Sequence, residues 1–176
     1  MYLFRRNYAI YLLALTLILS LVGAGWAQTA TPTAPDPANL YRQAVALLEQ
    51  AEQQLTAGNL SAALSQVKQS NALFTRLQKE SAAKLAERQL SSQESQQLAI
   101  NQKLAVEAQA KADPLLETAA AKKKEAEALR AKGQAEAGDA AERESKEQYL
   151  QAQTLSIKSA TYALRNQQII FRFLAS

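Results

Sequence analysis

The chain has 176 residues, about the length of one domain, and it contains neither cysteine nor histidine. These absences exclude disulfides, thiolate nucleophiles and every metal or catalytic site that needs an imidazole. The formal charge is +4, to which Arg5 and Arg6 in a predicted leader contribute two charges, so the rest is nearly neutral. We therefore expect no nucleic-acid partner, and no cofactor is indicated.

Residues 1–27 have the pattern of a secretory signal peptide. Two arginines precede the apolar run from Ile10 to Val22, and Gly25-Trp26-Ala27 places small residues before a cleavage site after Ala27. The stretch is also long enough to span a bilayer, so residues 8–26 are alternatively an uncleaved anchor in contact with the membrane. Both alternatives predict export to the periplasm or another extracytoplasmic compartment.

Residues 28–37 contain Pro32, Pro35 and Pro37, which exclude a helix, and they predict an extended linker. The remaining residues, 38–176, form the predicted domain. They are rich in Ala, Gln, Glu, Lys and Leu, which favour helices, and no segment alternates like a strand. We expect an all-α fold of four or five helices, arranged as elongated antiparallel hairpins in a tetratricopeptide-like or coiled-coil-like bundle.

The first hairpin has clear local signals. A helix is predicted from Ala38 to Ala57, and Gly58 suits the left-handed position that ends it. Asn59 is the expected N-cap of a second helix, which begins near Leu60. Because the connection is so short, the two helices should pack antiparallel.

Two boundaries in the middle of the chain each have two interpretations. Ser91 and Glu94 form a capping-box pattern that starts a new helix, unless one helix continues through Leu90. Asp113 and Pro114 are either the N-cap and first residue of another helix or a proline kink within a long one.

Beyond these boundaries, a helix should end near Ala131, and Gly133 to Gly138 should form a turn. Asp139 then resembles the N-cap of a last helix, which runs from about Ala140 toward Leu174. This helix carries large apolar residues at a seven-residue spacing: Leu150, Ile157, Leu164 and Phe171. A second stripe on another face consists of Leu155, Tyr162 and Ile169. A helix that is apolar on two faces is central in its own fold or paired with a partner.

The hairpin from Tyr41 to about Leu77 resembles a tetratricopeptide repeat, with Gly58 as the turn glycine. The apolar and small positions of that pattern are occupied by Leu47, Ala51, Leu60, Ala63 and Val67. Gln54 and Thr75 depart from it, since the family usually has an aromatic residue and a proline there. The segment around Ala126, Gly133 and Asp139 resembles a second, degenerate hairpin, and the whole body resembles small Ala-rich helical envelope proteins of bacteria. The repeat family implies protein–protein binding.

No pattern of catalytic residues is evident. Glu142, Glu144 and Glu147 are interleaved with Arg143 and Lys146, which is typical of a charged helix surface rather than of paired catalytic carboxylates. We therefore expect a non-enzymatic interaction or scaffold module of the envelope.

The predicted partner-binding residues are Leu164, Phe171 and Phe173, supported by Leu47 and Phe74. An apolar chain end needs a docking place, which is the protein's own first hairpin, another subunit, a partner protein or a membrane surface. The alternatives to a partner-binding module are accordingly a self-assembling coiled-coil-like protein and a lipid-surface helix protein.

Overall fold

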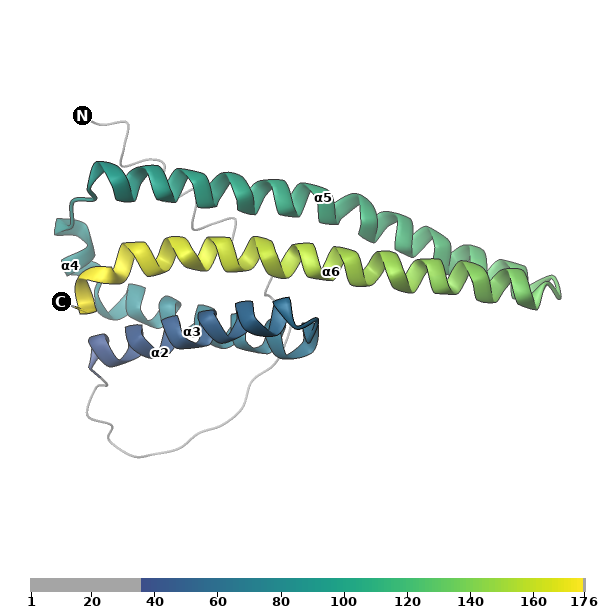
Figure 1. The fold of residues 1–176 in the computed structure, drawn as a ribbon, viewed down its shortest axis with the longest axis horizontal. Coiled ribbons are helices and arrows are strands. Elements are labelled where there is room, and N and C mark those ends of the chain that lie inside the picture. Colours follow the sequence, from purple (N-terminus) through teal and green to yellow (C-terminus); the bar gives the residue numbers. More distant parts are fainter. Residues whose placement is uncertain (1–35, 176) are drawn as a thin grey trace. The chain divides into compact units, whose positions relative to one another are not determined.

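The computed structural model describes residues 36–175, and within this range the chain is helical and has no strand (Figure 1). The elements are α2 (Pro37–Thr56), α3 (Leu60–Glu80), α4 (Ala82–Glu87), α5 (Ser92–Ala131), α6 (Ala135–Phe171) and a 3₁₀ helix, η1 (Arg172–Ala175). The predicted all-α class is confirmed. The predicted leader, its cleavage site at Ala27 and the alternative anchor at residues 8–26 lie outside the described residues.

The first helix begins inside the predicted linker. The side chain of Asp36 accepts a hydrogen bond from the Ala38 N–H at 3.1 Å, and Pro37 is the first helical residue. A proline is tolerated there because the first N–H groups of a helix have no intrahelical acceptor. The prediction that Pro37 excludes a helix is therefore wrong.

The turn between α2 and α3 has Gly58 in the left-handed region, with φ at 79°, as predicted. Asn59 occupies the N-cap position of α3, but its side chain makes no capping hydrogen bond. It donates instead to Gln54 Oε1 at 2.8 Å and so holds the turn closed from the side of α2.

The capping box that starts α5 is present. Glu94 N–H donates to Ser91 Oγ at 3.1 Å, and Ser91 N–H donates to Glu94 Oε2 at 3.0 Å. The boundary at Ser91 is therefore correct, and no helix continues through Leu90.

Pro114, by contrast, lies inside α5, so the interpretation as a helix boundary is wrong and the single long helix is correct. Pro114 lies on the exposed side of α5, so the backbone hydrogen bond that a proline cannot donate is missing on the side that faces solvent. Ala112 and Ala119 remain buried on the opposite side.

The last helix starts at Ala135, earlier than predicted, and Gly138 and Asp139 lie within it. A Cβ atom on Gly138 would lie 2.7 Å from Arg130 Cγ and 3.0 Å from the Ala126 carbonyl oxygen. Gly138 is therefore a close-packing residue of α6, and the predicted turn from Gly133 to Gly138 is wrong. Only Gly133, with φ at 76°, has the turn conformation.

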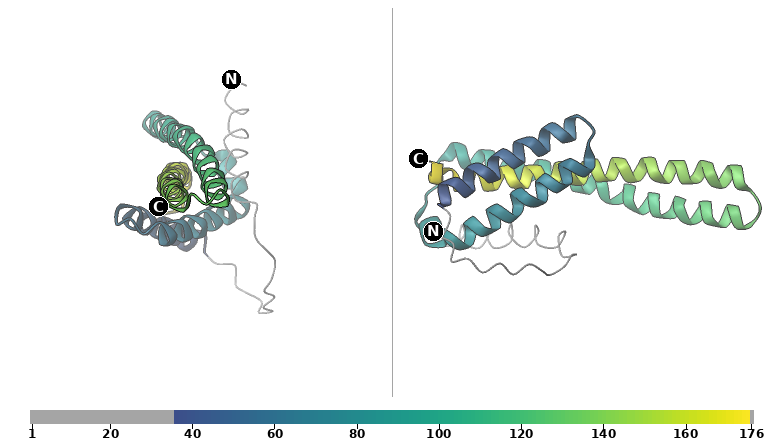
Figure 2. Two further views of the ribbon diagram at one scale, coloured as in Figure 1. Left: turned by 90° about the vertical axis from the view of Figure 1, so that its right-hand side faces the viewer. Right: turned by 90° about the horizontal axis from the view of Figure 1, so that it is seen from below.

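Helix α6 lies between α5 and the α2–α3 hairpin (Figures 1 and 2). α5 packs on α6 along most of its length, whereas α2 and α3 cover only the C-terminal half of α6 and together with it enclose the core. The parts of α5 and α6 next to the Gly133 turn extend past the α2–α3 hairpin, and we call residues 112–152 the arm. Between residues 36 and 175, no helix has the length and apolar character required to cross a bilayer.

Candidate interaction surface

Three of the five predicted partner-binding residues belong to the protein's own core. Phe74, Leu164 and Phe171 are at most 1% exposed, and the rings of Phe74 and Phe171 stack with their centroids 6.2 Å apart. Tyr41 meets Phe74 edge-on at 6.5 Å. The apolar end of the chain therefore docks on its own first hairpin, one of the expected places, and these three side chains are unavailable to a partner in this conformation.

The other two, Leu47 and Phe173, are half-buried. Phe173 packs at the edge of the core, and the guanidinium of Arg88 lies over its ring at 5.3 Å from the centroid. Arg88 also donates to the Ile169 carbonyl at 2.7 Å and pairs with Glu94 at 2.6 Å. This cluster ties the segment between α4 and α5 to the C-terminus, so Phe173 has a structural contact within the chain.

The seam between α5 and α6 is lined by small residues at a seven-residue spacing. On α5 these are Ala105, Ala112, Ala119 and Ala126, and on α6 they are Gly138, Ser145, Ala152 and Ser159. Ser145 Oγ donates to the Ala119 carbonyl at 2.7 Å, and Ser159 Oγ donates to the Ala105 carbonyl at 2.8 Å. Small side chains at such a seam let two helix backbones approach closely.

The arm is built on the same plan as the α2–α3 hairpin. Ser70 Oγ donates to the Ala44 carbonyl at 2.8 Å, and both serine–alanine pairs, 44–70 and 119–145, are 26 residues apart. Ala44 and Ala119 are separated by the same number of residues as Ser70 and Ser145, and as the turn glycines Gly58 and Gly133. A helical hairpin around Gly133 is thus present, as the sequence indicated, and its seam repeats that of the first.

The two hairpins differ on the face that lies beside the seam. In α2–α3 this face, which we call the covered face, consists of Tyr41, Leu48, Val67 and Phe74, and α6 keeps all four at most 6% exposed. The residues of the arm that follow these four by the same spacing are Leu116, Lys123, Glu142 and Tyr149, and we call them the arm face. Leu116 is 38% and Tyr149 53% exposed, because no helix of the described chain covers them.

Leu150 adjoins the arm face and is 52% exposed. It is the first member of the seven-residue stripe on α6, whose other three members are buried against α2 and α3. The α2–α3 hairpin ends before it reaches Leu150. Because Ala119 faces Ser145 across an antiparallel seam, Leu116 lies within one helical turn of the level of Tyr149 and Leu150.

Neither Leu116 nor Tyr149 was predicted from the sequence as a partner-binding residue. The signal that leads to both is the internal repeat. The interval between the two turn glycines, applied to Tyr41 and Phe74, gives Leu116 and Tyr149.

Charged side chains near the arm face form ion pairs, two of them between α5 and α6 and one within α6. Arg130 pairs with Asp139 at 2.6 Å and also with Glu142, and Lys146 pairs with Glu142 at 2.7 Å. The hydrogen bonds from Lys146 and Arg130 lower the pKa of Glu142 to about 2. Lys123, by contrast, makes no ion pair with any residue in the described range.

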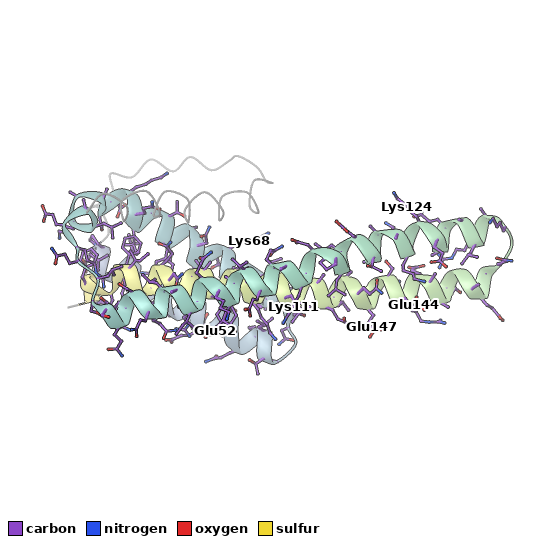
Figure 3. The ribbon with its side chains drawn as sticks, turned by 90° about the horizontal axis from the view of Figure 1, so that it is seen from above. Glu52, Lys68, Lys111, Lys124, Glu144 and Glu147 are labelled. Carbon is purple, nitrogen blue, oxygen red and sulfur yellow. The ribbon has the colours of Figure 1, made fainter. Side chains whose placement is uncertain are left out.

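The three glutamates of α6 that were considered as catalytic carboxylates have different surroundings. Glu142 is paired as above, Glu144 pairs with Lys122 at 3.0 Å, and Glu147 points outward from the arm, on the side opposite Lys124 (Figure 3). Residues 36–175 contain no acidic cluster arranged to hold a metal ion. The arm face with Leu150 is therefore the feature of this region that most resembles a binding surface. In comparisons with known proteins, the chain matches no protein-family model, no curated protein and no solved structure.

Proposed function

We propose that this protein is a non-enzymatic helical interaction module of the cell envelope and that it binds a partner protein through the arm face and Leu150. The observation that carries the proposal is the gathering of Leu116, Tyr149 and Leu150 from two helices at one level of the arm. Single exposed apolar residues are ordinary, whereas clusters of large ones mark interaction surfaces. None of these three residues belongs to the core cluster or packs against it.

The location in the envelope is proposed from the leader pattern of residues 1–27, which favours export whether the leader is cleaved or retained as an anchor. The tetratricopeptide-like spacing of the first hairpin also favours protein binding. The α2–α3 hairpin already has its covered face occupied by α6, so we assign partner binding to the arm.

A photo-crosslinking experiment in the native host tests this function. A photoreactive amino acid replaces Tyr149 in the tagged full-length chain, and a matched variant carries it at Ile100, an apolar residue of α5 that is 51% exposed but lies outside the arm. We expect one defined envelope protein to be captured from position 149 and not from position 100.

Capture of the protein's own chain from position 149 would favour the self-assembling alternative. The absence of any product beyond that of the Ile100 control would contradict the assignment of the arm as a binding surface.

A further inference from the structure

The way α6 covers the α2–α3 hairpin provides a template for what the arm face binds, an inference that rests on the proposed function of the arm. α6 runs antiparallel to α2 and parallel to α3 (Figure 1). Phe171 stacks on Phe74, which lies in the half of α3 farther from Gly58. Leu164 and Ile157, one and two seven-residue steps earlier, continue the contact toward the Gly58 turn. The apolar stripe of α6, together with η1 at its C-terminal end, thus buries the covered face.

The arm presents the same positions with a different chemistry. At the end near the α2–α3 hairpin, Leu116 and Tyr149 replace the two aromatic residues of the covered face and remain apolar. Nearer to Gly133, Lys123 and Glu142 replace the two aliphatic residues. Glu142 is already neutralised by Lys146 and Arg130, so Lys123 is the charge of the arm face that has no counter-ion in the described chain.

We propose that the arm face binds one amphipathic α-helix of a partner protein, which lies parallel to α6 and antiparallel to α5. An aromatic or large aliphatic residue of this helix packs between Leu116 and Tyr149, as Phe171 packs on Phe74. An acidic residue about seven positions earlier, in the place that Leu164 has on α6, faces Lys123. The partner is therefore recognised by a mixed stripe, with its acidic residue toward the Gly133 turn and its apolar residue toward the α2–α3 hairpin.

The occupant is a different protein rather than a second copy of this chain. The segment that matches the template most closely, the α6 stripe of Ile157, Leu164 and Phe171, is buried in each copy against its own α2 and α3. Its release would expose the covered face of that copy and lose the stacking of Phe171 on Phe74. A helix from another protein covers the arm face without this loss.

A designed peptide serves as the probe. It has the sequence of residues 152–171 with Leu164→Glu, which gives it a phenylalanine for Leu116 and Tyr149 and a carboxylate for Lys123. The purified full-length chain is labelled at Ala120→Cys, since the natural sequence has no cysteine and Ala120 is exposed beside the arm face. We expect saturable binding that Tyr149→Glu or Lys123→Glu weakens at least tenfold, whereas Ile100→Glu leaves it unchanged.

Reversal of the charges provides the specificity control. A second peptide with Leu164→Lys should bind the Lys123→Glu chain more tightly than the natural chain, and the first peptide should show the opposite preference. The proposal is overturned if the peptide does not bind saturably, if Tyr149→Glu leaves its binding unchanged, or if both peptides bind alike. Self-association of the full-length chain through Tyr149 would also overturn it, because a second copy would then cover the arm face.

The two proposals fail separately. If crosslinking from position 149 captures an envelope protein but the designed helix does not bind, the arm is a binding surface for a partner of another shape. If crosslinking captures nothing and the peptide does not bind either, the proposed function fails as well.

Discussion

The α2–α3 hairpin and the arm have the same turn and the same small-residue seam, yet one is covered and the other is not. α2 has 20 residues and α6 has 37. At about 1.5 Å per residue, α6 is therefore ~25 Å longer than α2 and passes the end of the hairpin that packs on it. The seam determines that two helices pair, whereas the reach of a third helix determines whether their outer face becomes core. Matching positions on the covered face and the arm face thus have opposite surroundings.

The largest effect is expected when matched aromatic residues of the two hairpins are truncated. Phe74→Ala removes a ring that is 1% exposed and should cost about 3–5 kcal/mol of the free energy of unfolding. Tyr149→Ala removes a ring that is 53% exposed and should cost at most about 0.5 kcal/mol. Chemical denaturation followed by circular dichroism measures both. Similar losses for the two variants would show that a helix covers the arm within the protein.

The next effect tests how closely the seam is packed in the arm. Gly138→Leu places a side chain where a Cβ alone would lie 3.0 Å from the Ala126 carbonyl, and overpacking of this kind costs about 1–3 kcal/mol. Ala137→Leu, on the exposed neighbouring position, should be within about 0.5 kcal/mol of the natural chain. Amide hydrogen exchange should show faster exchange near the Gly133 turn for the first variant only. Unchanged exchange in Gly138→Leu would mean that the tip tolerates wider helix spacing.

Local signals made much of this fold predictable. Gly58 and the Ser91–Glu94 capping box encode a turn and a helix start within a few residues, and both are where the sequence places them. Gly138 was misplaced because a glycine in a turn and a glycine in a close helix contact look alike in one sequence. Only the proximity of Arg130 and Ala126 across the seam distinguishes the two.

The candidate surface was harder to predict for a similar reason. The apolar stripe on α6 looks the same in the sequence whether the helices that bury it belong to this chain or to another. Phe171 proved to be covered by Phe74, which is distant in sequence, so the strongest apolar signal marks the core. The exposed residues Leu116 and Tyr149 have no strong local pattern and become evident only when the two hairpins are compared.

A smaller effect should come from the serines that bond across the seams. Ser70→Ala removes a donor to the Ala44 carbonyl and Ser145→Ala removes one to the Ala119 carbonyl, each worth about 0.5–1.5 kcal/mol. The exposed Ser65 is the control, and Ser65→Ala should change the free energy of unfolding by less than about 0.5 kcal/mol. The comparison of the hairpins predicts losses of similar size for the two seam serines. A neutral Ser145→Ala beside a costly Ser70→Ala would show that the arm seam depends on its alanines alone.

The smallest expected effect is a pH dependence of stability that arises in the arm and not in the α2–α3 hairpin. Lys146 and Arg130 hold the pKa of Glu142 at about 2, below its usual value of 4.5, whereas the matching position in α2–α3 is the uncharged Val67. Because the pKa is lowered in the folded state, the stabilisation is present above the usual value and is lost as the pH falls from 4.5 toward about 2.

Glu142→Gln should therefore have a lower melting temperature than the natural chain at pH 6 and nearly the same melting temperature near pH 2. The control is Glu147→Gln, which removes a charge that points outward (Figure 3). Its melting temperature should not converge with that of the natural chain in this way. Melting curves followed by circular dichroism at several pH values provide the measurement. A gap between Glu142→Gln and the natural chain that stays constant across this range would mean that the carboxylate contributes through packing. In that case Glu142 would contribute to the arm by packing, as Val67 does in the first hairpin. The covered face and the arm face would then differ only in whether another helix covers them.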